Sequence, residues 1–489
     1  MLAFVKLKAM MFQKGQLLMK INKTLVIFLF CHLLIWSILP LALRANLPMD
    51  SAEALIWGMV GEWGTYKHPP LSGWLADWAW LWGDKNPAVL YVLSQVLVVG
   101  ALVYIYKLAK CFLNKEKALV ATLLMEGVAY YSLVTPEYNC NIVALLLWPA
   151  CTYHFYQGIK DNNLFDWLAF GVFAGLNLLN KYVSGALLLS LGLYLLLTSA
   201  GRARLTSWKL YLGAIIALAV FTPHFIWLCN RDFFVIDYFL GRAGGHNLPY
   251  GLGHIVYPLK FLAAQIMTSA ATLLVLLVAW YKNKSTTKAH KQACQFIFFA
   301  GILPLLIMFL IPVISGNKLK SMWGSPSLYM LNIIWMVYLP FDTSKIKKKL
   351  LVAAYGLMLL FALAFTLQCV TTLSAKFKLN AYDFVNQVAP NATQYVGGNI
   401  WLASIIGSYH HNNPQVVFEL NFANNPWINK QDALTQGVLV IEEDINVYNA
   451  HKAEYPQLKK AKIYNLTTHN LWGKTKEYNF YYGYLAGEK

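Results

Sequence analysis

Ionisable side chains are scarce in this sequence, and a small group of them stands in short segments between long apolar runs. Charged groups beside hydrocarbon are costly to bury, so such residues are candidates for function. A carboxylate in such a place can act as a general base, and a cation can stabilise negative charge that develops during a reaction. The candidates are Asp50, Glu53, Lys67, His68, Glu137, Arg231, Arg242, Lys318 and Lys320.

The first acidic pair opens a predicted helix. Glu53 and Trp57 follow Asp50 at three- and seven-residue spacing, so all three share one helical face. This pattern predicts an amphipathic helix that lies at the membrane surface. A structural alternative stays open, because an acid followed three residues later by Glu resembles a capping box. Glu53 could then cap the helix while Asp50 faces a substrate.

Two further segments carry charge next to prolines. Pro69 and Pro70 predict an extended turn that holds Lys67 and His68 at the interface, where neighbouring tryptophans are also typical of a membrane anchor. Glu137 follows the dipeptide Thr-Pro. The same order is typical of a helix start, with a capping residue, a first-turn proline and an acid that matches the helix dipole.

Eleven apolar runs separate these segments and must position them. Of the 489 residues, 58% are hydrophobic and 13% are charged, against about 25% charged residues in soluble domains. Runs of this kind predict membrane-spanning helices, although three are short for a span, and the first is too long for a signal-peptide core. The runs are 24–43, 88–106, 118–134, 142–156, 164–179, 183–198, 210–229, 259–281, 296–314, 322–339 and 350–370.

Basic residues are unevenly shared between the two sides of the predicted membrane. If the chain crosses at every run, alternate loops lie on one side, and Lys and Arg are concentrated on the side of the N-terminus. The N-terminus is therefore predicted to be cytoplasmic and the C-terminus to be external. Because the basic residues occupy short loops, the net charge of +18 does not indicate a nucleic-acid partner.

The sequence pattern changes after residue 370. Residues 1–370 form the predicted transmembrane domain, with a long first external loop at 44–87, and residues 371–489 form a small external domain. Strand-like and helical runs in the second part predict a mixed α/β fold. The strand-like runs are 415–420, 438–441 and 478–485, and the helical run is 381–388. Neither the seven cysteines nor the pair His410-His411 has metal-site spacing.

Four motifs, in order along the chain, resemble those of the protein mannosyltransferase superfamily. They are Asp50-Ser-Ala-Glu53, Tyr66-Lys-His-Pro-Pro-Leu71 with Trp74, Thr135-Pro-Glu137, and Asn180-Lys181-Tyr182. The chain is most similar to the bacterial branch of aminoarabinose and galacturonic acid transferases that modify lipid A, over about residues 50–323. The resemblance implies a C-type glycosyltransferase (GT-C) fold in the bacterial inner membrane and a polyprenyl-phosphate sugar as donor.

The resemblance also implies roles for individual residues. Asp50 and Glu137 match the family's two acidic positions and are the predicted catalytic pair. The chain departs from related branches, which have Glu-Lys or Asp-His before the two prolines, because Lys67 and His68 stand there. The predicted substrate-binding residues are Glu53, Tyr66, Lys67, His68, Lys181, Tyr182, Arg231, Arg242, Lys318 and Lys320.

Transfer from such a donor leaves a phosphate anion, which Arg231 or Arg242 could grip with two hydrogen bonds while the lysines supply positive field. If the acceptor is a hydroxyl group, Asp50 is the predicted general base. If the acceptor is a phosphate of lipid A, it is already largely ionised, and Asp50 only orients groups. Direct displacement predicts inversion at the anomeric carbon. A divalent cation held by Asp50 and Glu137 is an open alternative.

The expected function is sugar transfer to lipid A or another envelope glycan on the periplasmic face. A flippase or transporter for a lipid-linked saccharide is the main alternative, and a protein O-mannosyltransferase is another. A transporter should carry polar residues within its helices near the middle of the bilayer. The candidates here cluster instead at one outer edge.

Overall fold

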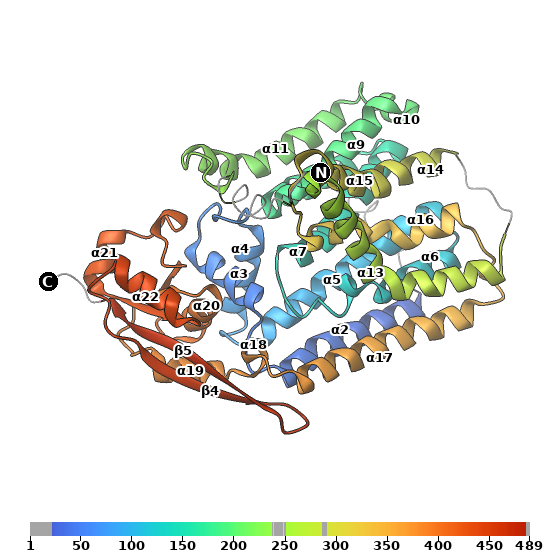
Figure 1. The fold of residues 1–489 in the computed structure, drawn as a ribbon. Coiled ribbons are helices and arrows are strands. Elements are labelled where there is room, and N and C mark those ends of the chain that lie inside the picture. The colour runs from blue at the N-terminus through green and yellow to red at the C-terminus, as the bar shows by residue number, and fades with distance from the viewer. Residues whose placement is uncertain (1–21, 237, 239–247, 249–250, 286–290, 486–489) are drawn as a thin grey trace, which may run out of the picture.

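A bundle of helices forms the larger part of the molecule (Figure 1). The computed structural model describes residues 22–236, 238, 248, 251–285 and 291–485. All eleven apolar runs fall on helical structure, so the predicted polytopic membrane bundle is confirmed. Within the described ranges, six helical stretches are long and apolar enough to span a membrane. They are α2 (Lys23–Leu43), α5 (Ala88–Phe112), α11 (Trp208–Cys229), α13 (Gly253–Lys282), Lys291–Ser315 and α17 (Lys347–Thr371).

The other runs form shorter or interrupted helices. The stretch Lys291–Ser315 consists of α14 (Lys291–Ile297), a π-helical turn at Phe298–Ile302 and α15 (Leu303–Ser315). A 3-10 turn follows α6 at Leu124–Gly127, and another, at Ser321–Met330, precedes α16. The remaining helices are α6 (Lys115–Leu123), α7 (Cys140–Asp161), α8 (Leu164–Asn180), α9 (Gly185–Leu197), α10 (Ser199–Arg202) and α16 (Leu331–Tyr338).

Small residues let the helices approach closely. A Cβ atom at Gly171 of α8 would lie 2.2 Å from the carbonyl oxygen of Gly213 in α11, so glycine is required where these two backbones touch. Such contacts are typical of helix pairs in membranes, where tight van der Waals packing replaces the hydrophobic effect.

The first external loop folds into two helices, α3 (Met49–Val60) and α4 (Leu71–Trp82). The predicted helix at Asp50 is present but is not amphipathic, because residues 51–58 of α3 are buried on every face of the helix. Its position at the membrane surface stays a prediction. A Cβ atom at Gly58 would lie 2.1 Å from the carbonyl oxygen of Gly73, so α4 packs directly on α3. The capping-box alternative is also wrong, since the N-cap residue of α3 is Pro48, whose side chain makes no capping hydrogen bond.

The C-terminal part forms the predicted mixed α/β fold and lies at one end of the bundle, next to α3 and α4 (Figure 1). Its five strands have the order β2-β1-β3-β5-β4, in which β1, β2 and β3 are parallel and β4 and β5 are antiparallel to their neighbours. The strands are β1 (Tyr395–Gly398), β2 (Gln415–Phe418), β3 (Val438–Glu442), β4 (Lys462–His469) and β5 (Thr475–Leu485). The helices are α18 (Ala375–Lys378), α19 (Ala381–Val388), α20 (Ile400–Tyr409), α21 (Lys430–Gln436) and α22 (Ile445–Glu454).

A buried polar cluster ties α2 to the interrupted third run. Glu126 is 1% exposed, and its two carboxylate oxygens contact His32 Nδ1 at 2.7 Å and Trp36 Nε1 at 2.8 Å. The hydroxyl of Ser132 donates to the Glu126 carbonyl at 2.8 Å, which holds the non-helical backbone in place. The Glu126 carboxylate contacts two ring nitrogens of α2, so the cluster fixes how α2 packs against the interrupted third run.

We predict that Glu126→Ala destabilises the protein strongly, because it leaves two buried ring N–H groups without their acceptor. A loss of about 3 kcal/mol is expected, seen as a lower midpoint of thermal unfolding in detergent. Glu116→Ala is the matched control, since the Glu116–Lys347 ion pair of 2.7 Å is well exposed and exposed pairs contribute about 1 kcal/mol or less. Equal midpoints for the two variants would contradict the prediction.

Candidate active site

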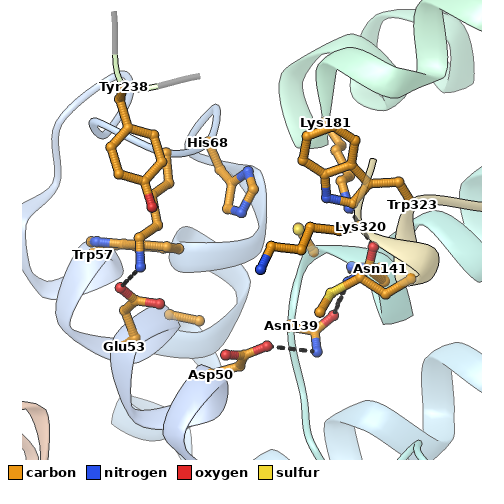
Figure 2. Close-up of a pocket in the computed structure, with 14 residues that line it drawn as sticks. Asp50, Glu53, Trp57, His68, Asn139, Asn141, Lys181, Tyr238, Lys320 and Trp323 are labelled. Carbon is orange, nitrogen blue, oxygen red and sulfur yellow. Dashed lines mark hydrogen bonds and ion pairs between the residues drawn. The ribbon is translucent and has the colours of Figure 1, made fainter. Parts of the chain in front are cut away.

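Residues from six separate segments line one cavity of about 140 Å³ (Figure 2). The segments are α3, the turn after it, the start of α7, Lys181 after α8, Tyr238, and the chain at 320–323. The charged and imidazole side chains in the lining are Asp50, Glu53, Lys67, His68, Lys181 and Lys320. Trp57, Met322 and Trp323 supply apolar surface beside them. Six of the residues that the sequence analysis selected therefore lie around one cavity.

One wall of the cavity is formed by one face of α3 and the turn that follows this helix. Glu53 forms an ion pair with Lys67 and accepts a hydrogen bond from the Tyr66 hydroxyl at 3.3 Å. Burial raises the pKa of the Glu53 carboxyl above its ordinary value of 4.5, and the nearby Lys67 ammonium opposes that rise. The Lys67 ammonium also lies 5.2 Å from the centre of the Tyr66 ring. Lys67 is thus held mainly by Glu53 and by aromatic faces.

The opposite wall begins at α7. Asn139 caps this helix, so the alternative in which Thr135 and Pro136 open the helix is wrong. The Asn139 amide nitrogen lies 3.4 Å from Asp50 Oδ2, and its amide oxygen accepts hydrogen bonds from the backbone and side-chain nitrogens of Asn141. Asn141 in turn accepts a hydrogen bond from the ammonium of Lys181.

Glu137 lies directly behind Asp50. Its Oε1 atom accepts a hydrogen bond from the backbone N–H of Asp50 at 3.3 Å, at the positive end of α3. Burial raises the pKa of the Glu137 carboxyl above 4.5, the Asp50 carboxylate raises it further, and Arg44 and Lys376 oppose the shift. Glu137 and Asp50 both line a smaller adjoining cavity of about 80 Å³. The two predicted acids therefore share one cleft.

Lysine supplies positive charge from two further segments. Lys181 is only 4% exposed, and its ammonium lies 5.8 Å from the centre of the Trp323 ring. Burial lowers the pKa of the Lys181 ammonium. Lys320 comes from the irregular chain before Ser321–Met330, and Figure 2 shows its side chain extending across the cavity toward the α3 wall.

Several predicted residues lie away from the cavity lining. Tyr66 is buried behind Glu53, and Tyr182 bonds to His224 at 3.0 Å. Arg231 donates to the Pro426 carbonyl at 3.1 Å and pairs with Glu62 at 3.5 Å, so it links the C-terminal part to the bundle. Lys318 is exposed. Arg242 lies outside the described residues.

The sequence analysis did not identify the asparagine side chains of the cavity lining or some of its apolar side chains. The missed lining residues that matter most are Asn139, Asn141, Tyr238, Met322 and Trp323. Asn139 and Asn141 follow Glu137 closely, and that proximity in sequence is the signal that could have identified them.

A metal site is not preformed here. Among the residues that the structure describes, no three His, Cys, Asp or Glu side chains come together in an arrangement that could hold a metal ion. Asp50 and Glu137 offer two carboxylates and no third acidic or imidazole ligand, so the fit to a divalent cation is poor.

A second cavity, of about 360 Å³, lies in the C-terminal part at the carboxyl ends of the parallel strands. Glu419, Glu442 and Glu443 line it, with Lys376 and His451. Its acidic lining opposes the binding of a phosphate group. The first cavity, with three lysines, has the charge that a phosphate requires.

Comparisons with known proteins agree with this geometry. The family model described as dolichyl-phosphate-mannose-protein mannosyltransferase matches residues 67–227. The lipopolysaccharide core galacturonosyltransferases RgtB and RgtA of Rhizobium johnstonii are 26% and 23% identical to this chain. The matches cover 63% and 64% of this chain and 65% and 64% of RgtB and RgtA, so the chain spans slightly less than two thirds of their length.

The fold is similar to two crystal structures of ArnT from Cupriavidus metallidurans, one bound to undecaprenyl phosphate and one in the apo state. In both cases the TM-score is 0.62 and the identity is 13%, over 95% of this chain and 99% of the ArnT chain. At that identity the likeness shows a shared fold. The sequence matches and the ArnT-like fold together support the resemblance that the motifs predicted, to the superfamily of protein mannosyltransferases and aminoarabinose transferases, and the shared fold is that of a multi-pass membrane protein.

Proposed function

We propose that this protein is a glycosyltransferase that moves a sugar from a polyprenyl-phosphate donor to a glycan acceptor of lipopolysaccharide. The observation that carries the proposal is the presence of Asp50 and three lysines, from separate segments, around one cavity. The names of the two Rhizobium relatives support a uronic acid as the sugar and the lipopolysaccharide core as the acceptor. The undecaprenyl phosphate in the ArnT crystal structure supports a polyprenyl-phosphate donor.

The lysines suit a donor of this kind because transfer increases the negative charge on its phosphate. Lys181 and Lys320 are the cations that we assign to the phosphate, because both line the cavity from segments other than the one that carries the Glu53–Lys67 ion pair. Charge-assisted hydrogen bonds to the phosphate bind the donor in the ground state, and they strengthen further as negative charge develops on the leaving oxygen. Trp57 and Trp323 offer apolar surface for the sugar and the first part of the prenyl chain.

Asp50 acts as the general base in this proposal. It takes the proton of an acceptor hydroxyl while that oxygen bonds to the anomeric carbon. The bond from the anomeric carbon to the phosphate oxygen breaks, and its electron pair stays on the phosphate. A single displacement of this type inverts the anomeric configuration. Glu137 holds the backbone of Asp50 in position through the 3.3 Å hydrogen bond.

The cavity faces the periplasm in this proposal, and the N-terminus is cytoplasmic. The concentration of Lys and Arg in alternate loops supports this orientation. Residues 1–370 then form the membrane domain, and residues 371–489 form a periplasmic domain that covers α3.

Asp50→Asn tests the chemical step. We expect a fall in kcat of about 100-fold or more, because a general base contributes about that much, with little change in protein yield or thermal stability. The assay uses purified protein in lipid nanodiscs, a polyprenyl-phosphate hexuronate and lipopolysaccharide core, with mass spectrometry of the product. Wild-type transfer rates in the Asp50→Asn variant would remove Asp50 from the mechanism. Movement of an intact donor across vesicles without bond cleavage would support the flippase alternative instead.

Lys320→Met tests the phosphate site. We expect the KM for the donor to rise about 10-fold or more, since a hydrogen bond to a charged group contributes about 1.5–3 kcal/mol. Lys318→Met is the matched control, because Lys318 lies two residues earlier in the same segment and is exposed. A similar KM for the two variants would show that Lys320 does not bind the donor.

A further inference from the structure

A row of amide groups runs along the cavity wall between Asp50 and Lys181 (Figure 2). The contacts are from Asp50 Oδ2 to Asn139 Nδ2 at 3.4 Å, from Asn139 Oδ1 to Asn141 Nδ2 at 2.9 Å, and from Asn141 Oδ1 to the Lys181 ammonium. Asn141 is 6% exposed and Lys181 is 4% exposed. The row therefore connects a carboxylate at the cavity to a buried cation through neutral groups alone.

The orientation of the Asn139 amide is fixed by its surroundings. Its oxygen must accept from the backbone N–H of Asn141, at 2.8 Å, to cap α7. Its nitrogen is then left to donate, to the Glu137 carbonyl at 3.0 Å and to Asp50 Oδ2. Since an amide nitrogen has two hydrogens, both are used, and a flipped amide would face the Asp50 carboxylate with an oxygen.

Capping alone does not require this arrangement. Aspartate caps a helix about as well as asparagine does, because the cap needs only the side-chain oxygen. The second function of the side chain, donation to Asp50, needs the amide nitrogen. Asparagine is the residue that meets both requirements at this position.

We propose that Asn139 is a positioning residue for Asp50, which it orients and keeps ionised through a neutral hydrogen bond. This inference rests on the proposed role of Asp50 as general base. No carboxylate lies within ion-pair distance of Lys181 in the described part of the chain, and its ammonium donates to Asn141 instead.

Other groups around Asp50 also set its protonation. Its own helix contributes Glu53, and the other elements at the cavity contribute Glu137, Cys140, Lys67, His68, Lys181 and Lys320. A substitution of Asn139 leaves all of these groups in place. Any change in the pKa of the Asp50 carboxyl therefore reports the side chain at residue 139.

Asn139→Asp separates positioning from capping. The cap is retained, but the donor to Asp50 becomes a second carboxylate, which raises the pKa of the Asp50 carboxyl by about one unit or more. We expect kcat at neutral pH to fall at least about 10-fold, the acidic limb of kcat against pH to move upward by about one unit, and the donor KM and thermal midpoint to change little.

Asn163→Asp is the matched control. Asn163 caps α8 and its amide also contacts a carboxylate, that of Asp166, but at the other end of α7. This variant should keep the wild-type pH profile. An unshifted acidic limb in Asn139→Asp, or an equal shift in Asn163→Asp, would overturn the positioning role.

A measurement without turnover keeps this test separate from the proposed function. Infrared titration of the carboxyl groups, with Asp50→Asn as the blank, gives the pKa of Asp50 in the wild type and in Asn139→Asp. A higher pKa in the variant supports positioning even if the purified protein transfers no sugar, a result that would count against the proposed function alone. An equal pKa overturns the inference.

Discussion

The ion pair between Glu53 and Lys67 is the interaction on which the cavity depends. A carboxylate and an ammonium beside hydrocarbon must each find a counter-charge, because either one alone would be too costly to bury. The turn that presents Lys67 is closed by Thr65, whose hydroxyl accepts hydrogen bonds from the backbone nitrogens of Lys67 and His68 at 3.2 and 3.0 Å. The pair therefore joins α3 to a turn that is itself fixed, and the two together form one wall.

That wall is held from behind by the C-terminal part of the chain. Gly407 of α20 lies against Ile56 of α3, where a Cβ atom would come within 2.7 Å of the Ile56 side chain. The Tyr409 hydroxyl accepts a hydrogen bond from the backbone N–H of Leu47 at 3.2 Å, just before α3 begins. The small α/β part thus acts as the support for Asp50, and a change in its core reaches the cavity through α3.

Much of this architecture could be predicted from the sequence, because it depends on regular periods. The apolar runs predicted the helices of the bundle. The three- and seven-residue spacing predicted that Asp50, Glu53 and Trp57 share one face of a helix, and all three line the cavity. Two of the five strands, β1 and β4, were missed. β1 is four residues long and ends in two glycines, and β4 has no regular alternation of polar and apolar residues, so neither has a strong strand pattern.

The candidate site was harder to predict, because its residues lie where the backbone is irregular. Lys318 and Lys320 are two residues apart in a segment without helix or strand, yet Lys318 is exposed and Lys320 lines the cavity. Side-chain direction follows from spacing only within a regular element, so sequence alone could not separate the two lysines. Asn139 differs from them, since a capping residue must turn its oxygen toward the helix that it closes. The direction of its amide nitrogen follows from that requirement. At the start of α7, beside Glu137, the orientation of a cavity side chain is therefore determined by helix capping alone.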